Sequence, residues 1–195
     1  MLTRIAVLVS GGGTNLQALI DAQAAGVLTA GRIELVVSNR ADAYALERAR
    51  AAGIKAAVCE NEAETLRFLE ARGTDLVILA GFMSILSAQF IARYPRRIIN
   101  IHPALIPSFC GKGMYGLHVH EAALRYGVKV TGATVHYVNE IPDGGEIILQ
   151  KAVEVEPGDT PDSLQKRVMR EAEWVILPKA AQLVSEKLAE EKQNG

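Results

Sequence analysis

The sequence has few of the features that mark secreted, membrane-spanning or nucleic-acid-binding proteins. Its 195 residues contain two cysteines, Cys59 and Cys110, which form neither a CxxC pair nor a zinc-like cluster, so a reducing cytoplasm fits best. No uninterrupted apolar run approaches the roughly 18 residues that cross a membrane, and the apolar start is too short for a signal peptide. Lys and Arg total 21 against 22 Asp and Glu, without a basic block, so we expect neither a nucleic-acid nor a membrane partner.

The chain also lacks internal repeats and low-complexity linkers, and we predict one domain over residues 1–195. Short apolar strands alternate with helical patterns, the strands being expected at 5–9, 33–37, 54–58, 76–80 and 97–102. Such βα units imply an α/β fold, an open, mostly parallel, twisted sheet with helices on both faces. Further strands at 130–138 and 146–153 flank a turn, which indicates antiparallel pairing near the C-terminal part, before a long helix over 161–187.

A glycine-rich loop, residues 10–15, separates the first strand from the first helix. Without Cβ atoms, its backbone N–H groups can approach an anion at the positive end of the helix, so the loop suits a phosphate. It lacks the full GxGxxG pattern of dinucleotide sites and the GKS or GKT ending of a P-loop, which disfavours both of those ligands. A tight turn that binds nothing would also explain the glycines.

Asn100 and His102 end the strand at 97–102. Side chains alternate across a strand, so both point to one side while Ile99 and Ile101 point to the buried side. Pro103 ends the hydrogen-bond ladder and keeps His102 extended at the carboxyl end of the strand, the mouth of the sheet, where ligands bind in open α/β sheets. An amide donor beside a group that titrates near neutral pH can stabilise an oxyanion and move a proton. The alternative is that both side chains satisfy loop backbone groups.

Asp143 lies in the turn Pro142-Asp-Gly-Gly145 and is placed to aim a carboxylate back toward this mouth. Its charge is expected to raise the pKa of His102 and keep the imidazole protonated, as general acid catalysis requires. Asp-Gly is also an ordinary turn dipeptide, so turn chemistry alone is the competing explanation.

The remaining histidines and the tryptophan are expected to have structural roles. His118 and His120 are two residues apart on a helix and do not face each other, and no third ligand follows at a recognised spacing, so no metal is expected. His136 alternates with apolar residues on a strand and is expected to order the site rather than perform chemistry. Trp174, in the last helix, is expected in the core.

Five motifs together resemble the phosphoribosylglycinamide formyltransferase branch of the folate-dependent formyltransferase family, over nearly the whole chain: SGGGTNLQ, LAGFM, INIHPALIP, GATVH and DGGEIILQ. The wider family shares the Asn-x-His-Pro element and a later Asp, whereas the Gly-Thr-Asn loop resembles the glycinamide ribonucleotide branch in particular. The resemblance implies a Rossmann-like formyltransferase fold.

The resemblance also implies a reaction. The amine of 5-phosphoribosylglycinamide would attack the formyl carbon of 10-formyltetrahydrofolate, giving formylglycinamide ribonucleotide and tetrahydrofolate in de novo purine (IMP) biosynthesis, without a metal. Asn100 would donate to the oxyanion, His102 would supply a proton, and Asp143 would hold the imidazole protonated and order water. The alternatives are a formyltetrahydrofolate hydrolase, a family that usually carries an extra N-terminal domain, and a noncatalytic folate- or nucleotide-binding regulator.

By the same resemblance, the substrate is bound by Gly11, Gly12, Gly13, Thr14, Asn15 and Glu173, although Glu171 is close enough to compete with Glu173. The folate donor is bound by Met83, Ser84, Ile85, Leu86, Asn100 and Ile141. The chain departs from the family pattern between Cys59 and Asp75, where many members carry a longer stretch with a basic residue near the ligands that Arg67 does not replace. It also departs at Ser84, where many members have Arg. The loop 108–115 is longer than in the shortest members, and Lys112 there is expected to restore a positive charge near the anionic ligands. Either a monomer or a homodimer is expected.

Overall fold

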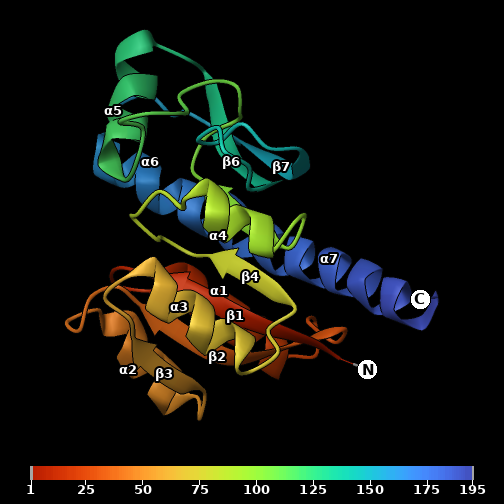
Figure 1. Ribbon diagram of the computed structural model, residues 1–195. Coiled ribbons are helices and arrows are strands. Elements are labelled where there is room, and N and C mark those ends of the chain that lie inside the picture. The colour runs from red at the N-terminus through yellow and green to blue at the C-terminus, as the bar shows by residue number, and fades with distance from the viewer. Residues whose placement is uncertain (1, 195) are drawn as a thin grey trace.

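The protein is built on a seven-stranded mixed sheet. Its strands are β1 (Thr3–Val9), β2 (Gly31–Ser38), β3 (Lys55–Val58), β4 (Leu76–Leu79), β5 (Ile98–His102), β6 (Val130–Tyr137) and β7 (Ile147–Glu154). The order is β3-β2-β1-β4-β5-β6-β7; the strands from β3 to β5 are parallel, and β6 and β7 pair in antiparallel fashion (Figure 1). This computed structural model describes residues 2–194, so residues 1 and 195, the outer bounds of the predicted domain, lie outside the described residues.

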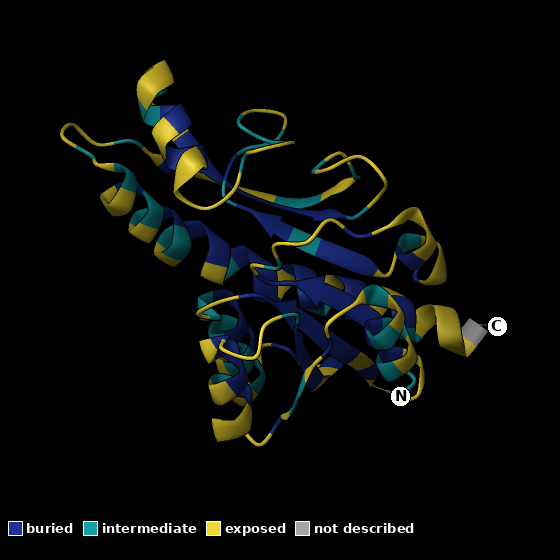
Figure 2. Ribbon diagram, turned by 60° about the vertical axis from the view of Figure 1, so that its left-hand side comes forward, coloured by how far each residue is buried: buried dark blue, intermediate teal, exposed yellow. Residues whose placement is uncertain are grey.

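Helices cover both faces of the sheet. They are α1 (Thr14–Ala24), α2 (Tyr44–Ala51), α3 (Glu62–Glu70), α4 (Ala88–Arg93), α5 (Leu117–Tyr126), α6 (Pro161–Val168) and α7 (Trp174–Asn194). One core cluster joins the sheet to α1, α2 and α7, and a second joins it to α3 and α4. Along β1, Ile5 and Val7 belong to the first cluster and Ala6 and Leu8 to the second. Burial on both faces explains why the strand reads as a continuous apolar run (Figure 2).

The structure confirms the predicted α/β sheet, mostly parallel with an antiparallel C-terminal part. The predicted helix over 161–187 is wrong in one respect, because a π-helical turn over Met169–Glu173 separates α6 from α7. A π turn changes the winding without changing the apolar composition, so periodicity did not reveal it. Trp174 follows this turn and is 38% exposed rather than in the core. Among residues 2–194, no helix is long and apolar enough to cross a membrane.

The strand order reverses between β1 and β4. The chain leaves β1 toward β2 and β3 on one side and returns to β4 on the other. In open α/β sheets, ligands bind outside the carboxyl ends of the strands at such a switch point. The segments that follow β1 and β4 therefore lie where a ligand is expected, and β5 ends beside them.

Candidate active site

Asn100 and His102 lie on β5, where the sheet changes from parallel to antiparallel pairing. Asn100 is opposite His136 and His102 is opposite Thr134 on β6. Ile99 and Ile101 are buried in the core between the sheet and α1 and α7, as the alternation predicts. The polar pair therefore occupies the other face of β5.

Asp143 reaches this pair by a less direct route than its position in the sequence suggests. Because β6 is antiparallel to β5, the turn after β6 starts beside the N-terminal end of β5, which is the end farther from His102. The turn then folds back over the sheet. Gly145 permits this, since a Cβ there would lie 1.6 Å from the Tyr137 carbonyl oxygen. The Asp143 carboxylate consequently lies 3.6 Å from His102 Nδ1 and 3.6 Å from His136 Nε2.

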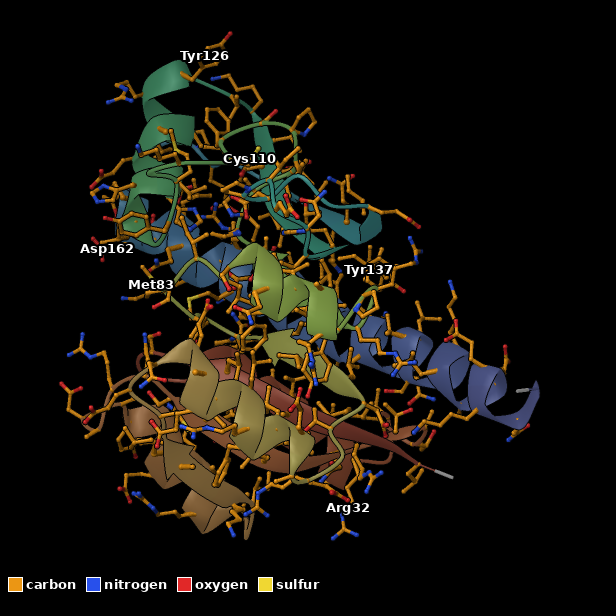
Figure 3. All side chains as sticks on the ribbon, in the orientation of Figure 1. Arg32, Met83, Cys110, Tyr126, Tyr137 and Asp162 are labelled. Carbon is orange, nitrogen blue, oxygen red and sulfur yellow. The ribbon has the colours of Figure 1, made fainter. Side chains whose placement is uncertain are left out.

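The loop between β5 and α5, marked by Cys110 in Figure 3, is bonded to the same groups. His102 Nε2–H donates to the Phe109 carbonyl over 2.8 Å, and the Gly111 N–H donates to Asp143 over 2.9 Å. Since a carbonyl only accepts, Nε2 carries the proton of the neutral ring and the Nδ1 lone pair faces Asp143. The loop thereby fixes both the tautomer of His102 and the carboxylate.

Burial has the larger influence on His102. The imidazole is 3% exposed, and burial lowers its pKa below 6.5 although the Asp143 charge and the Phe109 carbonyl both act to raise it. The expectation that Asp143 keeps His102 protonated is therefore wrong for this arrangement, because desolvation outweighs the attraction. Burial also acts to raise the Asp143 pKa, but hydrogen bonding, including the bond from the Gly111 N–H, lowers it on balance, so the carboxyl group is ionised.

His136 contributes more to the site than its sequence pattern indicated. Its Nδ1–H donates to the Tyr137 carbonyl over 2.8 Å, which leaves Nε2 to accept from the Asn100 amide over 3.2 Å. This bond occupies one N–H of Asn100 and directs the amide, and the second N–H stays available to a ligand. The alternation around His136 predicted its side of the strand, but the contact depends on the pairing of β5 with β6.

The glycine loop sits at the N-terminus of α1. Gly13 is the N-cap with φ +73°, and a Cβ there would lie 2.6 Å from the Ala45 Cβ, so the residue admits no side chain. Arg48 also holds the loop, donating from Nε to the Gly12 carbonyl over 2.8 Å. Around Gly11 and Gly12 no atom lies within 4 Å of an added Cβ. Open backbone at a helix N-terminus is a suitable site for a phosphate.

Glu173 joins this loop from the π-helical turn. The Asn15 amide donates to the Glu173 carboxylate over 2.7 Å, and both side chains are buried. Burial raises the pKa of Glu173 to about 6, and the Asn15 bond offsets part of the rise. Glu171 is instead half-buried and pairs with Arg170 over 2.8 Å. Of the two glutamates that the sequence left open, Glu173 is the one in contact with the glycine loop.

Apart from Asn100 on β5, the predicted folate residues occupy two irregular segments. Met83, labelled in Figure 3, and Ile85 are exposed apolar side chains between β4 and α4, Ser84 is exposed between them, and Leu86 is buried. Ile141, 66% exposed, lies two residues before Asp143. Exposed apolar side chains of this kind suit a flat aromatic ligand.

A cavity of about 580 Å³ lies on the α1 and α7 side of the glycine loop. Thr14, Arg48 and Trp174 contribute to its lining, but Asn100, His102 and Asp143 do not. In residues 2–194 no group of three or more His, Cys, Asp or Glu is arranged to hold a metal ion.

An amide, an imidazole and a carboxylate on a mostly parallel sheet, together with a phosphate-type loop, suit an enzyme that transfers a group through an oxyanion. The model of the formyl transferase family matches residues 3–181, and the chain belongs to this family. It is 43% identical over 183 residues to the phosphoribosylglycinamide formyltransferase of Escherichia coli (strain K12), covering 89% of this chain and 83% of that one.

Other relatives are longer. The trifunctional purine biosynthetic protein adenosine-3 of Homo sapiens is 44% identical, covering 98% of this chain, which spans 19% of that protein's length. Among solved structures, glycinamide ribonucleotide transformylase 1 from Symbiobacterium toebii has a TM-score of 0.88 and 44% identity, covering 95% of this chain and 89% of that one. This structural likeness agrees with the sheet order described above.

Proposed function

We propose that the protein transfers the formyl group of 10-formyltetrahydrofolate to the amine of 5-phosphoribosylglycinamide, as a step of de novo purine biosynthesis. The observation that carries the proposal is the meeting of Asn100, His102 and Asp143 on one face of the sheet. Family membership and the names of relatives that match most of the chain support it. Both cysteines are free thiols, consistent with a reducing compartment such as the cytoplasm.

The two substrates are assigned to the two ends of the site. The phosphate of the ribonucleotide would lie on the backbone of the glycine loop, with Asn15 and Glu173 beside it. The folate would lie against the segment from Met83 to Leu86 and against Ile141. The reaction would then require no metal, because an amide N–H meets the developing oxyanion while the imidazole and the carboxylate handle the proton.

In the proposed chemistry, the substrate amine attacks the formyl carbon and the formyl oxygen becomes an oxyanion. The free N–H of the Asn100 amide donates to it. The attacking nitrogen must lose a proton and N10 of the folate must gain one before the carbon–N10 bond breaks. Because burial keeps His102 neutral near pH 7, the His102–Asp143 pair can take up that proton and return it to the leaving nitrogen.

The test is an assay of the purified protein with both substrates, following formylglycinamide ribonucleotide by mass. Stoichiometric appearance of this product and tetrahydrofolate is the expected result. Formate release without the ribonucleotide would identify a hydrolase instead, and binding of both ligands without turnover would identify a noncatalytic regulator. Either outcome contradicts the proposal.

A further inference from the structure

A chain of hydrogen bonds crosses the switch point of the sheet and includes Asn39, to which the proposed reaction gives no role. It starts at Ser10, which directly follows β1 and is the first residue of the glycine-rich loop. The Ser10 hydroxyl accepts from the Met83 backbone N–H over 2.9 Å and donates to the Asn39 Oδ1 over 2.8 Å. The Asn39 amide nitrogen then donates to the Ser84 hydroxyl over 2.9 Å.

These bonds fix which group donates and which accepts at each step of the chain. Because the Ser10 hydroxyl already accepts from the Met83 N–H, its single hydrogen goes to the Asn39 oxygen. With its oxygen bonded to Ser10, the Asn39 amide presents its nitrogen to Ser84. Asn39 therefore joins the end of β1, the end of β2 and the segment after β4 in a fixed orientation.

The segment so joined has little structure of its own. Residues 80–87 form neither helix nor strand, and Met83, Ser84 and Ile85 are exposed. Ser10 is buried and Asn39 is half-buried, so the chain runs from the rigid sheet to the exposed segment. An irregular segment holds a ligand well only when supporting hydrogen bonds fix its backbone.

We propose that Asn39 is a positioning residue that, through Ser10 and Ser84, holds the Met83–Leu86 segment in the shape that binds the folate donor. This inference rests on the proposed function for the identity of the ligand. Asn39 itself need not touch the folate. Its loss should weaken folate binding while leaving the loop backbone over 11–15 and the Asn100, His102 and Asp143 cluster intact.

The experiment measures two quantities in Asn39→Ala: the dissociation constant of tetrahydrofolate by calorimetry, and the steady-state constants of formyl transfer. Loss of two hydrogen bonds should raise the tetrahydrofolate dissociation constant and the KM for 10-formyltetrahydrofolate about tenfold. The kcat and the KM for 5-phosphoribosylglycinamide should stay within about twofold, since a general disturbance would change them together. Asp42→Ala is the matched control, because Asp42 pairs with Arg40 in the same turn and is exposed.

A double-mutant cycle separates positioning from direct contact. Ser84→Ala, an exposed change expected to fold even where Asn39→Ala does not, should raise the dissociation constant about threefold, because one hydrogen bond is lost. If Ser84 acts through Asn39, the double variant should bind tetrahydrofolate as Asn39→Ala does. Additive effects, or unchanged binding in either single variant, would overturn the inference. Since calorimetry requires no turnover, failure of formyl transfer in the parent protein would contradict the proposed function and leave this test standing.

Discussion

The glycine loop and the Asn100, His102 and Asp143 cluster are assembled in opposite ways. The loop is a run of consecutive residues whose backbone groups meet a ligand at the end of α1. The cluster uses side chains from β5 and from the turn after β6, which come together only because β6 pairs with β5. One site depends on local conformation and the other on the topology of the sheet.

The two regions also handle charge differently. At the loop, the backbone N–H groups at the positive end of a helix favour an anion. In the cluster, two ionisable groups, His102 and Asp143, lie close together, so burial competes with pairing and decides the state of His102. Substitutions in the cluster should therefore act on kcat, and those at the loop on substrate binding and stability.

The largest expected effect is that of Asn100→Ala in the cluster. Removing one oxyanion donor typically costs about 100- to 1000-fold in kcat, so steady-state assays should show a loss of this size with both KM values little changed. Asn61→Ala is the matched control, because Asn61 caps α3 and its loss should cost about 1 kcal/mol of stability without changing kcat. A kcat within about tenfold of the parent value would remove Asn100 from the chemistry.

The sequence predicts the strands and the glycine loop because both are local. The apolar run at 76–80 and the pattern at Asn100 and His102 need only the alternation of a strand, and the structure places them accordingly. The π-helical turn escaped detection because its residues keep an ordinary helical composition.

The site was harder to predict where its properties depend on several segments at once. The pKa of His102 follows from its burial under the loop that carries Phe109, which no residue near His102 reveals. The bond between Asn100 and His136 requires the register of β5 and β6. Sequence reasoning therefore found the chemical groups but overestimated the effect of Asp143.

Gly13→Ala tests the glycine loop, the region that depends on local conformation. The substituted residue would need a positive φ and would place its Cβ 2.9 Å from the Ala45 Cα, so unfolding free energy should fall by about 1–3 kcal/mol. The KM for 5-phosphoribosylglycinamide should rise with it. Gly12→Ala, which meets no atom within 4 Å, is the control for stability in urea unfolding. Equal stability of both variants would contradict the steric argument.

Glu173→Gln should reveal the cost of a buried carboxylate beside the loop. The pKa of Glu173 rises from 4.5 to about 6 on folding, so its protonated form is favoured in the native state. That contribution, about 2 kcal/mol from the 1.36 kcal/mol of each pKa unit, is present below pH 4.5 and lost as the pH rises through 6. The parent protein should lose this stability relative to Glu173→Gln between those pH values.

Urea unfolding of both proteins across this pH range measures the difference and cancels the other titrating groups. Glu171→Gln, a change at a half-buried glutamate of the same turn that pairs with Arg170, should show no such dependence. A constant difference between Glu173→Gln and the parent protein at all pH values would mean that the carboxylate is not desolvated in the folded state.

The smallest expected effect is that of Lys112→Ala. This variant tests whether the loop between β5 and α5 supplies a positive charge to the anionic substrates. Lys112 follows Gly111, whose N–H binds Asp143, and its side chain is exposed, so its interactions are screened by water and salt. We expect a rise of about two- to threefold in the KM of one anionic substrate, fading as salt is added. Lys55→Ala, an exposed change on the distant edge strand β3, is the control. Unchanged KM values for both substrates at low salt would show that this loop acts on the cluster through its backbone alone.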